Sequence, residues 1–348
     1  MLTLPIGQLI RRNFHGERHD NGSIPLISVP RILSRLAQGL LVVFISASIA
    51  FLLMKSVKGD EFTHLLESTN TSATLIATLR EESGHNAPLL TQYGSWLSRV
   101  VRGDLLPSSS HPGDSVASLI RSALPNTLLL MTLALVSSMA GGIALGAWQG
   151  VKAGTRFDRA SNRITLSIIS VPDFWVAMIL ILLFALHQTW FPTGYMSSNR
   201  SDLSTWEMLR DRLHHLVLPW FSLTLINAAA FARYQRAAMR DVASQHFLRT
   251  ARAKGVPESI VIWNHALRVA VLPLVTIAGM FFPALLVGTI LIEKVFSWPG
   301  MGSLLTKAVS SRDYALVCGI IIVGSAMAAL GSLLADIGRE LLDPRLRS

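Results

Sequence analysis

The stretch SALPNTLLLMTLALVSSMAGGIALGAWQGV, residues 122–151, decides the fold class because it contains no Asp, Glu, Lys or Arg. A bilayer core about 30 Å thick needs roughly 20 apolar residues in a helix, so this stretch is long enough to cross a membrane. Gly142, Gly146 and Gly150 recur in it every four residues. That spacing favours a smooth helix face for close packing, although glycine is also generally common in membrane helices.

Five further runs have the same character. Residues 36–54, 216–232, 269–292 and 314–335 contain no charged side chain, and residues 164–186 contain only Asp173. Over the whole chain 15% of residues are charged and 51% are hydrophobic, whereas a soluble domain carries about 25% charged residues. The sequence therefore predicts an all-α polytopic membrane protein with about six transmembrane helices.

The net charge of +10 raises the question of nucleic-acid binding. If the N-terminus is cytoplasmic, most of the 31 Lys and Arg residues fall in the shorter inside segments 1–35, 151–163, 233–268 and 336–348. This asymmetry follows the positive-inside rule, which explains the basicity without a polyanion. We therefore expect a multi-pass membrane protein with cytoplasmic termini and no nucleic-acid partner.

The spans divide the chain into four parts. Residues 1–30 read as a cytoplasmic N-terminal tail, 31–55 as the first span, retained as a signal anchor, 56–121 as an external loop, and 122–348 as the core of the remaining spans. Part of the loop is amphipathic, with apolar residues near helical spacing at Leu89, Leu90, Tyr93, Trp96, Leu97, Val100 and Val101. Such a helix either lies on the outer leaflet or the bundle, or forms a cap that touches a partner.

Asp173 lies inside the run 164–186, in the motif SVPDFW (170–175). A mid-span proline frees a backbone carbonyl, and an aspartate facing lipid is costly. Two interpretations stay open: Asp173 bonds to backbone or a neighbouring helix beside a kink, or it lines a solute path. The ten histidines are scattered and Cys318 is the only cysteine, so we assign no metal site.

The segment after the fourth span reads RYQRAAMRDVASQHFLRTARAKGVPESIVIWNHALR. Gly255 and Pro257 divide it into two predicted helical pieces. The first is basic through Arg233, Arg236, Arg240 and Arg249, and the second carries an apolar stripe, Ile260, Val261, Trp263, Ala266 and Leu267. Two interpretations are possible. The segment forms a protruding knob that is joined rigidly to the fifth span and binds a soluble partner, or it forms a loop that lies on the membrane surface.

RTARAKG (249–255) followed by HALRVAVLPLVT (265–276) resembles the coupling-loop signature of ABC-importer permeases of the oligopeptide, dipeptide and nickel group. Further segments resemble this group in order along the chain: RGDLLPS (102–108), LPNTLLL (124–130), GVKAGTRFD (150–158), SVPDFW, FPTGY (191–195), EKVFSWPGMGSLLTKAVSSRDY (293–314) and DPRLR (343–347). The chain departs from the group in its long N-terminal tail and at the exit of the first span, VKGDEF (57–62).

The resemblance implies an importer of two homologous permease subunits, two cytoplasmic ATP-binding subunits and an external binding protein. Residues 236–268 would be the coupling loop that engages an ATPase. The implied coupling residues are Arg249, Thr250, Ala251, Arg252, Ala253, Lys254, Gly255 and His265. ATP and Mg would bind the partner chains, and this chain has no G-x-x-x-x-G-K-[ST] motif and is expected to be non-catalytic.

Two further groups of residues follow from the same resemblance. Asp173, Phe174, Trp175 and Asn227 are assigned to the translocation pathway. Trp298, Pro299 and Gly300 form either a simple tight turn, with Trp298 in the interface belt, or an external gate near the binding-protein dock. The implied solute is a peptide or similar small molecule, such as a nickel chelate, glutathione or a sugar-phosphate conjugate, and the implied location is the bacterial inner membrane.

Two other function classes compete with this interpretation. A secondary transporter or channel without an ATPase predicts several ionisable groups inside the spans and inverted repeats, but only Asp173 is embedded. An integral-membrane enzyme needs clustered acids, histidines or a nucleophile near one membrane face, and the sequence shows no such cluster.

Overall fold

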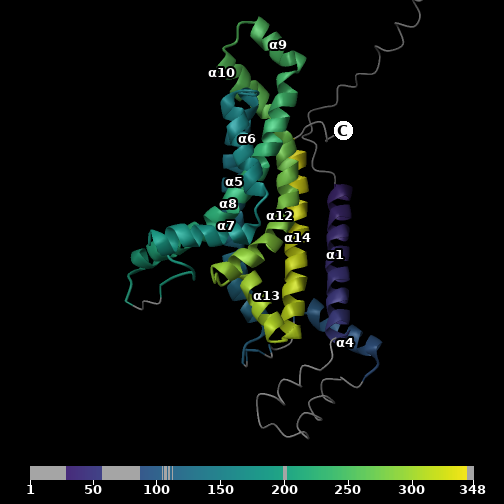
Figure 1. Ribbon diagram of the computed structural model, residues 1–348. Helices are drawn as coiled ribbons and strands as arrows, with labels where there is room; N and C mark the ends of the chain where they lie inside the picture. Colours follow the sequence, from purple (N-terminus) through teal and green to yellow (C-terminus); the bar gives the residue numbers. More distant parts are fainter. Residues whose placement is uncertain are drawn as a thin grey trace, which may run out of the picture.

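The computed structural model describes residues 29–56, 87–103, 105, 108, 110–111, 113–198 and 202–342. Most of the predicted N-terminal tail, the first half of the external loop and the ending DPRLR lie outside the described residues. All regular elements within the described ranges are helical, as the fold-class prediction requires. Figure 1 shows a bundle of long helices with a short helical protrusion at one end, formed by α9 and α10.

The bundle consists of long helices joined by short ones. The long helices are α1 (Val29–Ser56), α5 (Val116–Val151), α6 (Arg156–Ile169), α8 (Thr205–Ala243), α12 (Leu272–Val295) and α14 (Tyr314–Leu342). The short ones are α4 (Leu89–Val101), α7 (Asp173–Leu180), α9 (His246–Ala253), α10 (Glu258–Ile260), α11 (Leu267–Ala270) and α13 (Met301–Ser310), with π-helical segments η2 (Ile181–His187) and η3 (Val261–Ala266).

Five described helices are long and apolar enough to cross a membrane, and six if a bent pair counts as one span. The bent pair is α6 with α7–η2, which meet at 102°. The sequence predicted one span over 164–186 with a kink, and the structure instead breaks it at residues 170–172. Pro172 has no amide hydrogen to continue the helix, and a proline disfavours helical geometry at the residue before it.

The tightest pair in the bundle is α5 with α8, which lie side by side in Figure 1. The predicted glycine face lies in this contact. A Cβ added to Gly142 or Gly146 would overlap the backbone of α8, and one added to Gly150 would meet Met239 at 2.5 Å. The missing side chains therefore let the two backbones approach closely, as in small-residue helix pairs of membranes.

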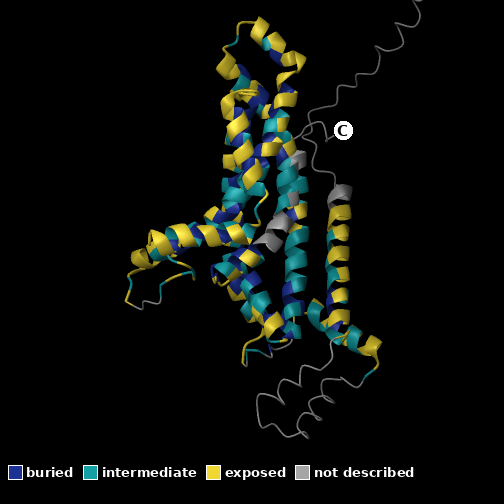
Figure 2. Cartoon of the chain, in the orientation of Figure 1, coloured by how far each residue is buried: buried dark blue, intermediate teal, exposed yellow. Residues whose placement is uncertain are grey.

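The amphipathic part of the external loop is α4, and it packs on the bundle. Trp96 is buried, with its ring centroid 5.2 Å from that of Phe51 on α1, and Cys318 of α14 belongs to the same cluster. The Tyr93 hydroxyl lies 2.7 Å from the Ser48 hydroxyl. These contacts favour the bundle-packed interpretation of α4. Much of α1 is exposed (Figure 2), and its exposed residues include large apolar ones such as Leu40 and Leu53, which suits a lipid-facing helix.

The two ends of the bundle differ. The corner between α5 and α6, the helices α9 and α10, and the end of α14 lie toward one end, while α4 and α13 lie toward the other (Figure 1). The structure thus brings the basic segments 151–163 and 233–268 to the same end. This is the arrangement that the charge pattern of the sequence predicted.

Candidate functional site

The protruding end is formed by residues 244–266, which we call the knob. It contains α9, a turn at residues 254–257, α10 and η3. The predicted division at Gly255 and Pro257 is present. The first predicted piece, however, is split again, because α8 ends at Ala243 and α9 begins at His246. Arg233, Arg236 and Arg240 therefore lie on α8 and not in the knob.

Gly255 ends α9 with a defined backbone turn. Its φ is +75°, in the left-handed region, and no atom lies within 4 Å of a Cβ built on it. The Gly255 N–H donates to Arg252 O at 3.0 Å and the Val256 N–H to Ala251 O at 3.2 Å. This is the Schellman pattern of helix ends, so the motif needs glycine for its conformation and not for lack of space.

The underside of the knob is apolar and buried. Its core joins α8, α5 and the knob through Met239, Val242, Ala147, Leu248, Val261 and Ala266. The knob is therefore seated on α8 and α5 as well as joined to α12 through α11. Ile260 and Trp263, expected in the apolar stripe, are exposed by 41% and 48%, because Val261 and Ala266 are the members of the stripe that are buried in this core.

The outer face of the knob presents cations beside apolar side chains. Of the predicted coupling residues, Arg249, Thr250, Arg252, Ala253, Lys254, Gly255 and His265 are exposed and Ala251 is half-buried. The Arg252 guanidinium donates to Glu258 at 2.8 Å across the turn. Together with the exposed rings of Phe247 and Trp263, this face has the composition of a protein-binding surface.

A buried ion pair below the knob was missed at the sequence level. Arg236 Nε lies 2.6 Å from Asp158 Oδ1 and Arg236 Nη2 lies 3.0 Å from Asp158 Oδ2, while the Gly154 N–H donates to the same carboxylate at 2.9 Å. Asp158 is 2% exposed. The pair fixes the α5–α6 corner to α8. Arg236 is thus a structural cation and not part of a free basic surface, which corrects the sequence interpretation.

The predicted pathway residues come from two helices, α7 and α8. Asp173 opens α7 directly after the break at Pro172 and is half-buried, while Phe174 and Trp175 are exposed by 37% and 53%. Asn227 lies on α8, half-buried, and its amide donates to Leu223 O at 2.7 Å. The break itself places polar backbone in the middle of a predicted span, which membranes tolerate where the backbone is buried in protein or lines a cavity.

The turn after α12 is held from beneath by Glu293. This side chain is fully buried and accepts hydrogen bonds from Thr127 Oγ1 at 2.6 Å, Gly302 N at 2.7 Å and Ser303 N at 3.1 Å. A Cβ on Gly300 would overlap the Glu293 carboxylate. The carboxylate therefore caps the start of α13 and ties it to α5, a role that the sequence pattern did not reveal.

Trp298 lies inside this turn and not in an interface belt, which corrects the expectation. It is 1% exposed, and its Nε1 donates to Asn126 O at 3.2 Å. Pro299 O accepts from the Asn126 amide at 2.8 Å. Because Trp298 packs with Leu130 of α5 and Leu180 of α7, the turn is joined to the bundle core. Pro299 is exposed and Gly300 is buried.

A second buried carboxylate fastens the external loop to the bundle. Asp313 accepts from the Ser108 hydroxyl at 2.5 Å, the Ser110 hydroxyl at 2.7 Å and Leu316 N at 3.0 Å. Burial by itself raises the pKa of Asp313, but the hydrogen bonds outweigh it and hold the pKa below its ordinary value. The residues before α5 and the start of α14 are therefore held together by an ionised group.

A helical bundle with a broken span, a seated knob at one end and a clamped turn at the other defines a multi-pass membrane protein. The comparisons give the family. Residues 142–348 match the binding-protein-dependent transport system inner membrane component. Among the described residues, no group of His, Cys, Asp and Glu could hold a metal ion.

The relatives extend this match over nearly the whole chain. The chain is 34% identical over 298 residues to an oligopeptide transport system permease protein of Bacillus subtilis, covering 86% of this chain and 93% of that protein. It is 34% identical over 319 residues, 91% and 98% of the two chains, to a glutathione transport system permease protein of Escherichia coli. The chain belongs to this family, as an ABC-importer permease of the oligopeptide and dipeptide group.

Proposed function

We propose that this permease subunit forms half of the translocation pathway of an ATP-driven importer for peptides or similar small solutes. A second homologous permease subunit completes the pathway. Two cytoplasmic ATP-binding subunits hold ATP and Mg, and this chain carries no catalytic site. An extracytoplasmic binding protein delivers the solute. The knob faces the cytoplasm, as do both termini.

The observation that carries the proposal is the seating of the knob. Its cationic and apolar outer face is exposed, while Leu248 and Val261 on its underside are buried against α8 and α5. A displacement of the knob by a partner would therefore move spanning helices directly. The names of relatives, which include oligopeptide and glutathione permeases, support a peptide or peptide-like solute.

The coupling role can be tested by reversing charge on the outer face of the knob. Arg249→Glu combined with Lys254→Glu replaces exposed cations without touching the buried underside. We expect the nucleotide-binding subunits to associate at least about tenfold more weakly, about 1.4 kcal/mol. The measurement is co-purification and titration of those subunits with the membrane-inserted variant.

Arg159→Glu on α6 is the matched control, since Arg159 is exposed at the same end of the molecule outside the knob. Unchanged association of the double variant, or an equal loss with Arg159→Glu, would contradict the coupling role. Uphill solute uptake by this chain alone in liposomes would instead support a secondary transporter and remove the need for an ATPase.

A further inference from the structure

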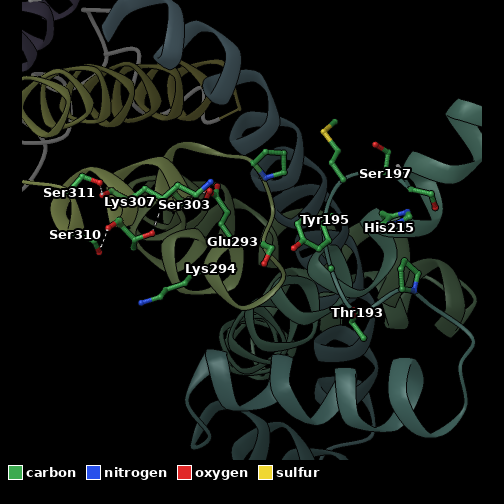
Figure 3. A pocket seen from close by; sticks show the side chains of 17 residues that line it. Thr193, Tyr195, Ser197, His215, Glu293, Lys294, Ser303, Lys307, Ser310 and Ser311 are labelled. Atoms are coloured by element: carbon green, nitrogen blue, oxygen red, sulfur yellow. Dashed lines mark hydrogen bonds between the residues drawn. The ribbon is translucent and has the colours of Figure 1, made fainter. Parts of the chain in front are cut away.

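A large open cavity of about 1290 Å³, lined mostly by residues with polar side chains, lies between the loop after η2, the end of α12 and α13. It is larger than the roughly 300–1,000 Å³ of pockets that hold small molecules. Figure 3 shows its walls: Thr193, Tyr195 and Ser197 come from the loop, Lys294 from α12, and Ser303 and Lys307 from α13. No residue of the knob lines it.

The α13 wall is a continuous polar helix face. Ser303, Thr306, Lys307, Ser310 and Ser311 follow the three- and four-residue spacing that places side chains on one side of a helix. The opposite side, with Met301, Leu304 and Ala308, packs in the core with Val116 and Ile120 of α5. The sequence of α13 thus directs hydroxyl groups and an ammonium group into the cavity.

The cavity is positively charged. Lys294 and Lys307 are both exposed, and neither forms an ion pair among the described residues. The one carboxylate in the lining, Glu293, is fully buried and already accepts hydrogen bonds from Thr127 and the start of α13. His215, also in the lining, is buried, with Nδ1 2.9 Å from Asp211 O. The lysine ammonium groups are therefore the charges offered to a ligand.

The hydroxyl groups of the α13 wall can accept hydrogen bonds from a ligand. Thr306, Ser310 and Ser311 each donate to a carbonyl of their own helix at 2.9 Å. Their hydrogens are thus engaged, and each hydroxyl oxygen keeps its lone pairs for accepting further hydrogen bonds. A ligand with one carboxylate and several N–H donors matches this combination, and that is the chemistry of a peptide with a free C-terminus.

The loop wall is fixed before any ligand binds. Tyr195 N donates to Phe296 O at 2.7 Å, and Ser198 N and Oγ donate to Asp211 at 2.6 and 2.7 Å. Tyr195 and Ser297, both in the lining, hold left-handed φ values of 65° and 51°. Non-glycine residues held in such conformations concentrate at ligand-binding and active sites.

We propose that this cavity is a solute subsite in which Lys294 and Lys307 bind the carboxylate terminus of the transported peptide. The inference rests on the proposed peptide-import function and adds a recognition element to it. Hydrogen bonds to charged groups are the strong ones in proteins, so the terminal carboxylate contributes to affinity through these lysines, and the hydroxyl face of α13 accepts from peptide N–H groups.

The test uses the assembled importer in nanodiscs without its external binding protein. The probes are tetra-alanine with a free C-terminus and tetra-alanine amide. Acetylation by an amine-reactive reagent is followed at single lysines by mass spectrometry. We expect the free acid to protect Lys294 and Lys307 at about tenfold lower concentration than the amide does. Lys152, at the opposite end, should react equally with both.

Matched variants locate the effect. Lys294→Gln and Lys307→Gln should each lose most of the preference for the free acid, and Lys294→Arg and Lys307→Arg should retain it. Arg210→Gln removes an exposed cation of α8 outside the lining and should leave the preference unchanged.

Equal protection of Lys294 and Lys307 by the free acid and by the amide would overturn the proposal. Uptake by the wild-type importer separates this failure from that of the proposed function. If both tetrapeptides are imported but the lysines show no preference, only the subsite is wrong. If neither is imported, the peptide-import function fails and the subsite fails with it.

Discussion

Single residues fix the local geometry at both ends of the molecule, each for a different physical reason. Gly255 is needed because its backbone is left-handed in open space. Gly300 is needed because the Glu293 carboxylate occupies the place of its Cβ. The sequence places both glycines in turns, but only the tertiary structure distinguishes a conformational requirement from a steric one.

Gly255→Ala tests the conformational requirement at the end of α9. The alanine Cβ fits into open space at this position, but the residue must adopt a left-handed backbone, which costs about 1–2 kcal/mol. We expect a lower thermal midpoint of the purified subunit in detergent, with the knob more susceptible to proteolysis. Gly94→Ala in α4 is the control, since Gly94 is helical and equally unobstructed, and it should be neutral or stabilising by up to about 1 kcal/mol. Equal effects of the two substitutions would contradict this account.

Glu293→Ala tests the clamp under the outer turn. The change leaves buried donors of Thr127, Gly302 and Ser303 without their acceptor, and each unsatisfied group costs about 1–3 kcal/mol. We expect a large loss of thermal stability, with Glu293→Gln intermediate because its carbonyl oxygen still accepts. Glu258→Ala, which removes an exposed carboxylate of the knob, should leave the midpoint close to wild type. Equal thermal midpoints of Glu293→Ala and Glu293→Gln would show that the hydrogen bonds of Glu293 do not stabilise the turn.

At the scale of elements, helix pairing is set by small residues and helix continuity by proline. The four-residue glycine repeat of α5 was predicted as a packing face, and the structure places it against α8. The break between α6 and α7 was expected only as a kink, because the sequence marks where a helix is interrupted but not the 102° through which it turns. That angle depends on the core in which Ala177 and Leu180 of α7 are buried with Leu218 of α8 and Trp298.

Gly146→Ala tests the α5–α8 pair. The new Cβ would lie 2.7 Å from Gln235 Cβ and overlap the Ala232 carbonyl, and overpacking of this kind costs typically about 1–3 kcal/mol. We expect reduced thermal stability and reduced yield of folded protein. Gly141→Ala, five residues earlier on the same helix, meets only Ala228 Cβ at 3.9 Å and should be tolerated. A similar loss at both positions would argue against close packing of the glycine face.

At the scale of the whole molecule, the knob and the helix α13 lie toward opposite ends of the bundle (Figure 1). The clamped turn and the cavity lie at the α13 end, because residues of α13 line the cavity. In the proposed function, this separation would let one end engage a cytoplasmic partner while the other faces a solute. The charge asymmetry of the sequence indicates the orientation, since basic segments stay in the cytoplasm.

Accessibility labelling checks this orientation in cells. In a Cys318→Ala background, Ser310→Cys on α13 should react with an impermeant maleimide added from outside, because Ser310 is exposed and α13 lies at the end opposite the knob (Figure 1). Lys254→Cys on the knob should react only after the membrane is permeabilised. Reaction of Lys254→Cys from outside would invert the topology and remove the coupling role. The natural Cys318 is buried, and alanine suits its apolar surroundings.

The sequence by itself determined the membrane class, the approximate spans, the glycine face of α5 and the position of the knob. These features follow from composition and local periodicity, since a lipid core accepts only long apolar helices and glycine ends helices in a characteristic way. Only the tertiary structure decided which polar residues are buried partners. Arg236 meets Asp158 and Glu293 meets Thr127, because residues far apart in the chain are brought together by helix packing. It also decided that Lys294 and Lys307 share one cavity, since their distance in space is set by the fold of α12 onto α13 and not by their spacing in the sequence.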